Sequence, residues 1–165
     1  MQTYRPNSMT DFTIRRANYD DLPILEQLMY RLHDEHHHAE PEHFKAPEQI
    51  LEEKKIVEYI NAPDALLYVA VDNSVLVGFV TAHFGELSST VSKPVMMGTI
   101  DELYVVTEQR CNGIGKRLLQ RCIDEFDDYG VKQVFVEVWE FNQSAISLYQ
   151  HIGFKHHIHC LRKGL

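Results

Sequence analysis

The N-terminal part of the chain alternates between strand-like and helix-like spacing of its apolar residues. Residues 12–16 are expected to form a first strand. Asp20 and Asp21, followed by a proline in the first turn, predict a helix that continues to about His33. The apolar face of this helix consists of residues three or four positions apart: Leu22, Leu25, Leu28, Met29 and Leu32. A second helix is expected over residues 47–60, up to the proline that follows.

The remainder of the chain predicts strands and helices in alternation. Strands are expected over residues 66–71, 75–83, 99–106 and 133–139. Residues 72–74 join the first two of these with side chains typical of a hairpin turn. Helices are expected over residues 113–129 and 144–152, and the tail over residues 154–162 is expected to add one or two strands. Two successive strand-then-helix units predict an α/β fold, in which helices cover both faces of a twisted, partly parallel mixed sheet.

Composition limits the class of protein. A chain of 165 residues, 44% apolar and 24% charged, is expected to be one domain over residues 1–165, with residues 1–10 a loose extension. There is no signal-peptide pattern and no membrane-length apolar run, and the three cysteines are scattered, so a cytoplasmic location without membrane association is expected. A net charge of −8 argues against nucleic acid as a partner and favours a cationic substrate.

The most informative segment is a predicted strand that runs into a glycine-containing turn and then a helix. Gly113 and Gly115 let the backbone turn tightly and let a ligand approach the amides. The first amides of a helix have no internal acceptors and lie at the positive end of its dipole, so they favour an anion such as a phosphate. Lys116, Arg117 and Arg121 lie in the first turns, against the preference of the dipole, which is expected where a phosphorylated ligand binds.

Two motifs in this region resemble those of the GCN5-related N-acetyltransferases. Residues 110–115, Arg-Cys-Asn-Gly-Ile-Gly, match the family pattern Q/R-x-x-G-x-G/A. Residues 142–154 match a second pattern, N-x-x-A-x-x-x-Y-x-x-x-G-F. The resemblance implies the acyl-CoA N-acyltransferase fold, acetyl-CoA as co-substrate without a metal, and attack of an amine on the thioester through a tetrahedral intermediate.

The resemblance also assigns roles to individual residues. It implies that amides in the turn, with Arg110 nearby, hold the pyrophosphate of acetyl-CoA: Cys111, Asn112, Gly113, Ile114, Gly115 and Lys116. The strand Leu103, Tyr104 and Val105 is similar to the one that binds the pantetheine arm and the acetyl carbonyl through its backbone. Asn142 is expected to contact the cofactor, and Tyr149 to protonate the departing thiolate.

The general base is left open between two acids. Asp101 and Glu102 are adjacent on a strand, so their side chains are expected on opposite faces of the sheet, with only one facing the substrate. The run around Asp101 resembles the diamine acetyltransferase branch, whereas the histone-type glutamate corresponds to Thr99 here. A water chain in place of either acid stays possible.

The histidine-rich segment 33–43 lacks HExxH and is interpreted as a helix end and loop. In similar proteins this segment borders the acceptor site, which implies that Glu35, His36 or Glu40 could recognise an amine; the alternative is a merely polar loop. The leading hypothesis is acetylation of a small primary amine such as a polyamine, an amino-acid-like amine or an aminoglycoside. The alternatives are acetylation of a protein N-terminus or lysine, and a CoA-binding sensor without turnover. A homodimer is compatible with the resemblance.

Overall fold

The computed structural model of the protein describes residues 11–165, so the expected N-terminal extension over residues 1–10 lies outside the described residues. Five strands are present: β1 (Phe12–Arg16), β2 (Ala65–Asp72), β3 (Val75–Leu87), β4 (Val95–Val105) and β5 (Gln133–Val136). Five α-helices accompany them: α1 (Leu22–Ala39), α2 (Pro47–Glu53), α3 (Glu58–Asn61), α4 (Ile114–Asp128) and α5 (Gln143–His151). Two short 3-10 helices, η1 (Tyr19–Asp21) and η2 (Thr107–Gln109), precede α1 and α4.

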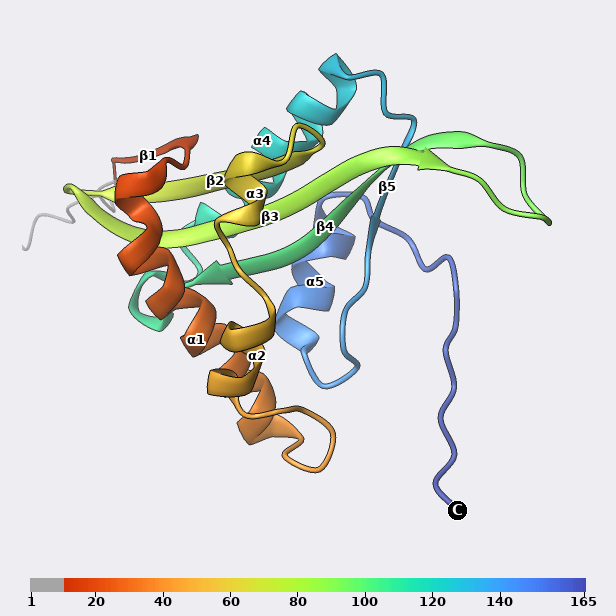
Figure 1. Ribbon diagram of the computed structural model, residues 1–165, viewed down its shortest axis with the longest axis horizontal. Coiled ribbons are helices and arrows are strands. Elements are labelled where there is room, and N and C mark those ends of the chain that lie inside the picture. The colour runs from red at the N-terminus through yellow and green to blue at the C-terminus, as the bar shows by residue number, and fades with distance from the viewer. Residues whose placement is uncertain (1–10) are drawn as a thin grey trace, which may run out of the picture.

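The strands form one mixed sheet in the order β1-β2-β3-β4-β5 (Figure 1). β1 to β4 are antiparallel neighbours, and β5 runs parallel to β4. The expected mixed sheet is therefore confirmed. Its parallel step is the crossover from β4 through α4 to β5, which follows the rule that parallel neighbours need a long connection.

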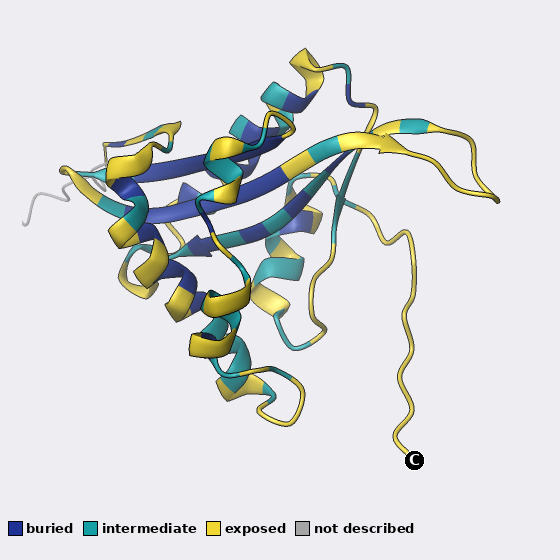
Figure 2. Ribbon diagram, in the orientation of Figure 1, coloured by how far each residue is buried: buried dark blue, intermediate teal, exposed yellow. Residues whose placement is uncertain are grey.

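Two apolar clusters lie on opposite faces of the sheet. On one face, α4 and α5 pack against the strands through residues that include Leu118, Phe126 and Tyr149. On the other face, α1 packs with residues before α3 and with the strands through Leu25, Met29 and Ile56, among others. The central strands are buried between these layers, as the dark blue ribbon in Figure 2 shows.

Several predicted boundaries differ from the structure. β3 continues four residues past its predicted end, to Leu87, and β4 begins four residues before its predicted start, at Val95. α1 continues six residues past His33 to Ala39, because no glycine or proline interrupts the chain between Pro23 and Pro41. The single helix expected over residues 47–60 is divided into α2 and α3, with extended backbone at Lys54. β5 ends at Val136 rather than at Trp139.

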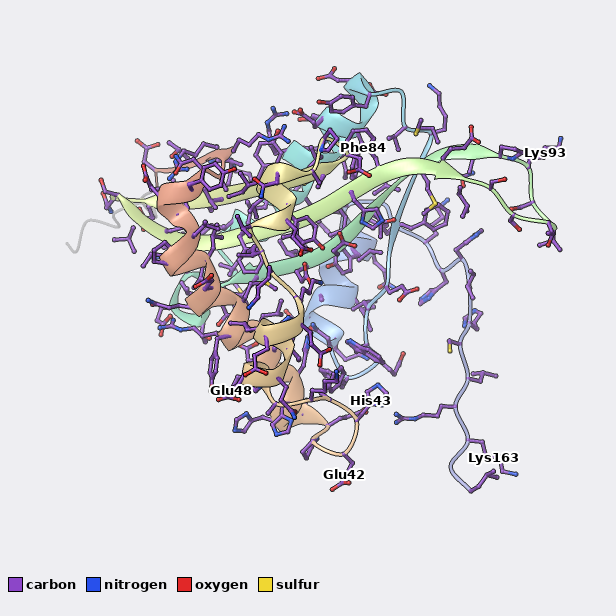
Figure 3. All side chains as sticks on the ribbon, in the orientation of Figure 1. Glu42, His43, Glu48, Phe84, Lys93 and Lys163 are labelled. Atoms are coloured by element: carbon purple, nitrogen blue, oxygen red, sulfur yellow. The ribbon has the colours of Figure 1, made fainter. Side chains whose placement is uncertain are left out.

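The prediction of one or two strands in the tail is wrong. After Phe154 the chain is exposed and contains no strand (Figures 1 and 2), although Arg162 near its end contacts Glu40 and His43 in the segment after α1. Ile158 and Leu161 are 78% and 92% exposed, so the tail has no buried face of the kind that stabilises a strand. Lys163 marks its far end in Figure 3.

Candidate active site

The first element of the site is an open edge of β4. β5 pairs with β4 only from Met97 to Ile100, and no other strand among residues 11–165 pairs with that edge as β4 continues to Val105. The amide of Val106 donates to the carbonyl of Val77 at 2.9 Å, which directs this residue toward β3. Since polar groups alternate in direction along an antiparallel strand, those of Leu103 and Val105 face the open edge.

The second element is the turn that enters α4. Cys111 and Gly113 adopt left-handed backbone angles, φ 64° and 80°, and the exposed residues 111–113 lead directly into the helix. Gly113 caps the helix without a side-chain hydrogen bond, so the first amides of α4 remain available to a ligand. The predicted strand, turn and helix are confirmed, and the arrangement has the geometry of an anion site.

Gly115 has a packing role that the sequence did not reveal. A Cβ built at this position would lie 3.2 Å from Cδ2 of Leu148 on α5. A glycine here lets α5 pack closely against the first turn of α4. The sequence analysis had assigned both Gly113 and Gly115 to the tight turn and the close approach of a ligand.

Arg110 is engaged by protein groups. Its Nε donates to the carbonyl oxygen of Val105 at 2.9 Å, and one terminal nitrogen contacts the two carboxylate oxygens of Glu35 at 2.7 and 3.0 Å. The guanidinium also lies 5.3 Å from the ring centroid of Tyr104, whose hydroxyl donates to Glu35 at 3.2 Å. The side chain expected near the pyrophosphate thus links the open edge of β4 to α1.

The two predicted residues of α5 lie at its start and in its buried face. The side-chain oxygen of Asn142 accepts from the amide of Ala145 at 3.1 Å and caps the helix. Tyr149 is 7% exposed, packs edge-on against Phe154, and has no hydrogen-bond partner for its hydroxyl among residues 11–165. Burial raises the pKa of Tyr149 to about 12, so the phenol keeps its proton throughout the physiological range.

A β-bulge places both candidate acids on one face of the sheet. Thr81 pairs with Glu102 and Ala82 with Ile100, so Asp101 is the extra residue on β4. The bulge reverses the alternation: Ile100 packs in the α4 cluster, whereas Tyr104, four residues on, packs in the α1 cluster. The expectation that Asp101 and Glu102 point to opposite faces is therefore wrong.

Each acid has partners from outside β4. Asp101 accepts from the hydroxyl of Tyr59 at 3.0 Å and from Nδ1 of His83 at 2.8 Å. Because a carboxylate only accepts, Nδ1 of His83 must donate, and Nε2 on this half-exposed ring is left able to take a proton. The raised pKa of Tyr59, caused mainly by burial and then by Asp101, keeps this phenol protonated.

Glu102 is more deeply buried, with a side chain 6% exposed against 16% for Asp101. It accepts from the hydroxyl of Thr81 and forms an ion pair with Nζ of Lys54, the residue that follows α2. Burial lowers the pKa of Lys54, and nearby Asp101 partly opposes this effect. Sequence reasoning missed the four partners of these acids, Lys54, Tyr59, Thr81 and His83, because they come from separate elements and belong to no motif.

The histidine-rich segment packs against a group of aromatic side chains, Phe44, Trp139 and Phe141, which we call the aromatic wall. Among residues 11–165, no group of three or more His, Cys, Asp or Glu side chains is arranged to hold a metal ion. The ring of Phe44 lies 5.4 Å from His36, 4.8 Å from Trp139 and 6.0 Å from Phe141. These rings join the loop after α1, where Figure 3 labels His43, to the loop before α5.

His33 is the unusual member of this segment. Its Nε2 is buried and has no hydrogen-bond partner within residues 11–165. Burial, and then the nearby charges of His36 and Lys54, lower the pKa of His33 to about 4. The imidazole is therefore neutral near pH 7.

Comparison with known proteins identifies the family. The family profile described as "Acetyltransferase (GNAT) family" matches residues 27–154. This chain belongs to the GNAT acetyltransferase family. It is an N-acetyltransferase, and the family uses acetyl-CoA as the acetyl donor.

Individual relatives agree with this assignment. An N-alpha-acetyltransferase of Saccharolobus solfataricus is 26% identical over 153 residues, covering 88% of this chain and 81% of the relative. The crystal structure of an acetyltransferase from Vibrio fischeri is 50% identical and has a TM-score of 0.63, over 77% of this chain and 96% of that one. A mutant protein from Bacillus halodurans shares the fold with a TM-score of 0.86 at 19% identity, over 93% and 99% of the two chains. No helix among the described residues is long and apolar enough to cross a membrane.

Proposed function

We propose that this GNAT acetyltransferase transfers the acetyl group of acetyl-CoA to a primary amine on a small cationic molecule, such as a polyamine, an amino-acid-like amine or an aminoglycoside. The observation that carries the proposal is the bulge, which places Asp101 and Glu102 together beside the open edge of β4. Glu102 already binds an ammonium group, that of Lys54. Buried carboxylates next to the reacting groups favour a positively charged acceptor.

The donor side of the proposed site follows from the backbone. The exposed turn and the uncapped start of α4 support a pyrophosphate site formed by the amides of residues 111–116. The polar groups of Leu103 and Val105 at the open edge suit the pantetheine arm and the thioester carbonyl, because an amide fixed in a strand can stabilise a developing oxyanion. Arg110, which holds the carbonyl of Val105, is assigned to the pyrophosphate end of this edge, and Asn142, which caps α5, to a contact with the cofactor.

The proposed acid and base lie on opposite faces of the sheet. Tyr149, in the cluster with α4, donates its proton to the leaving thiolate. Asp101 is the favoured base, since it is more exposed than Glu102 and is joined to His83, whose free Nε2 can pass the proton to solvent. Glu102 is assigned to binding the acceptor, because its ion pair with Lys54 shows that it holds a cation.

Acetylation of a protein N-terminus is the second candidate. It is favoured by the relative from Saccharolobus solfataricus, which is named an N-alpha-acetyltransferase. The aromatic wall of Phe44, Trp139 and Phe141 offers a surface for the side chains that follow a peptide N-terminus. Acetylation of peptides, with no acetylation of small free amines, would select this alternative.

We further propose that residues 1–165 act as one domain and that two copies of the chain pair through the tail. The apolar side chains of Ile158 and Leu161 are almost fully exposed there. Light scattering coupled to size exclusion tests the pairing: a dimer that becomes a monomer when residues 156–165 are removed supports it, and a monomer in both cases refutes it.

The deciding experiment measures thiol release from acetyl-CoA with polyamines, aminoglycosides, amino acids and short peptides. Release with a small cationic amine supports the proposal, and release with peptides alone replaces it with the second candidate. Tyr149→Phe is the matched variant, because it removes one hydroxyl that has no partner among the described residues. We expect its kcat to fall by about 10²-fold with KM and Tm almost unchanged. Unaltered kcat would rule out Tyr149 as the acid.

A further inference from the structure

Lys54 brings a primary amine of the protein itself to the acceptor side of β4. The residue lies just after α2, where the backbone leaves the helix and becomes extended. Its side chain crosses to β4 and pairs with Glu102, one residue before Leu103 at the open edge. The ammonium also lies 6.0 Å from the ring centroid of Tyr59, the phenol that donates to Asp101.

The neighbouring lysines are arranged differently. Nζ of Lys55 donates to the carbonyl of Leu51 at 2.7 Å on the exposed surface. Nζ of Lys45 bridges the carboxylate of Glu53 at 2.7 and 2.8 Å, also on the surface. Lys54 and Lys55 are adjacent in sequence and carry the same amine, so they differ only in where the structure directs them.

The environment of Lys54 favours its reaction as a nucleophile. Only a neutral amine attacks a thioester, and burial lowers the pKa of Lys54, which makes loss of its proton easier. The amine is attached to the protein that binds the thioester, so its effective concentration at the site exceeds that of a free acceptor. The side chain is 38% exposed, so it is not sealed from solvent.

We propose that Lys54 is a self-acetylation site, modified by acetyl-CoA bound to the same molecule. This proposal rests on the proposed function and assigns a protein acceptor to that site. The Lys54 ammonium gives one proton to Glu102, and the neutral Nζ attacks the thioester carbonyl. The new C–N bond gives a tetrahedral intermediate, and its collapse breaks the C–S bond while Tyr149 protonates the thiolate. The second nitrogen proton passes through Asp101 to solvent, and Tyr149 regains one proton from solvent. The products are acetyl-Lys54, CoA and the proton held by Glu102, which passes to solvent, and no redox partner is needed.

The test incubates the full chain with acetyl-CoA and no added amine, and follows intact mass and then peptide fragments that separate Lys54 from Lys55. We expect one acetyl group at Lys54, with a rate constant independent of protein concentration. Labelling at Lys54 should be at least about tenfold faster than at Lys55. Lys55→Arg should label as the unsubstituted protein does, and Lys54→Arg should lose the fast label. Because the position is read in the unsubstituted protein, the result does not depend on how well a variant folds.

Several results would overturn the inference. Equal rate constants at Lys54 and Lys55, or a rate constant that rises with protein concentration, would show ordinary chemical or intermolecular acetylation. Undiminished labelling in a Tyr149→Phe variant whose kcat with free amines has fallen would show the same. A parallel assay with the amine panel separates the two proposals. Turnover of an amine without modification of Lys54 refutes self-acetylation alone. If there is neither turnover of an amine nor modification of Lys54, and acetyl-CoA gives no thermal shift, the proposed function is refuted as well.

Discussion

Replacement of Gly113 by alanine tests the turn before α4 most directly. Gly113 has φ 80°, a left-handed conformation that is unfavourable for a residue with a Cβ by about 1–2 kcal/mol. A Cβ added here would meet no atom within 4 Å, so backbone strain is the whole effect. In a chain of this size, that strain corresponds to a fall in Tm of roughly 2–8 °C.

Gly130 supplies the matched control. It follows the opposite end of α4 with φ 77°, and a Cβ there would also meet no atom within 4 Å. Gly113→Ala and Gly130→Ala should therefore lose similar stability. The two variants should differ in their affinity for acetyl-CoA. A turn that has relaxed at position 113 must return to its strained conformation when the pyrophosphate binds. A turn that has relaxed at position 130 lies at the other end of α4 and need not change on binding.

The assay is acetyl-CoA titration by calorimetry, with thermal melts of both variants. If the free protein relieves the strain by moving the turn, Gly113→Ala should bind acetyl-CoA roughly 5- to 30-fold more weakly. Gly130→Ala should bind as the unsubstituted protein does. Equal affinities in the two variants, together with a Tm of Gly113→Ala that shows the strain to be relieved in the free protein, would refute the assignment of the pyrophosphate site to this turn.

Two further predictions concern ionisable groups. Asp101→Asn should lower kcat by about 10²-fold or more, whereas Glu102→Gln should mainly raise KM for cationic amines; steady-state kinetics showing the reverse pattern would exchange their roles. For His33, the folded pKa of about 4 lies below the unfolded value of 6.5, so the unfolded state gains protons first as the pH falls. This residue should therefore reduce the free energy of unfolding by about 2 kcal/mol between pH 7.5 and 5. Denaturant melts should show a smaller acid loss in His33→Gln, and identical losses in both proteins would contradict the buried, neutral imidazole.

Local pattern was enough to predict much of the fold and the turn to which the donor is assigned. Apolar spacing found β1 and located α4 and α5 to within a residue or two at each end, and the glycine turn pointed to an anion site. These features depend on residues close together in the chain, such as Gly113 and the helix that follows it. The family resemblance agreed with the profile match over residues 27–154.

The acceptor side could not be predicted in the same way, because it depends on one extra residue and on distant partners. Strict alternation places Asp101 and Glu102 on opposite faces, and only the register with Thr81 and Ala82 reveals the bulge. The partners Lys54 and His83 lie in the α2–α3 connection and in β3, with no spacing that links them to β4. The tail was misjudged for a related reason, since a strand exists only where another strand accepts its hydrogen bonds.

If the proposed roles of the α4 turn and of Tyr149 hold, the close packing of Leu148 on Gly115 connects donor binding to cleavage of the C–S bond. Gly115 belongs to the turn of α4 that is proposed to hold the pyrophosphate, and Leu148 immediately precedes Tyr149 on α5. In the proposed site, this contact between α4 and Leu148 contributes to the distance between the anchored end of the donor and the phenol. A methyl group at position 115 would move the phenol relative to sulfur while leaving the anchoring amides in place. A substitution that enlarges residue 115 would therefore slow departure of the thiolate without weakening binding of the donor.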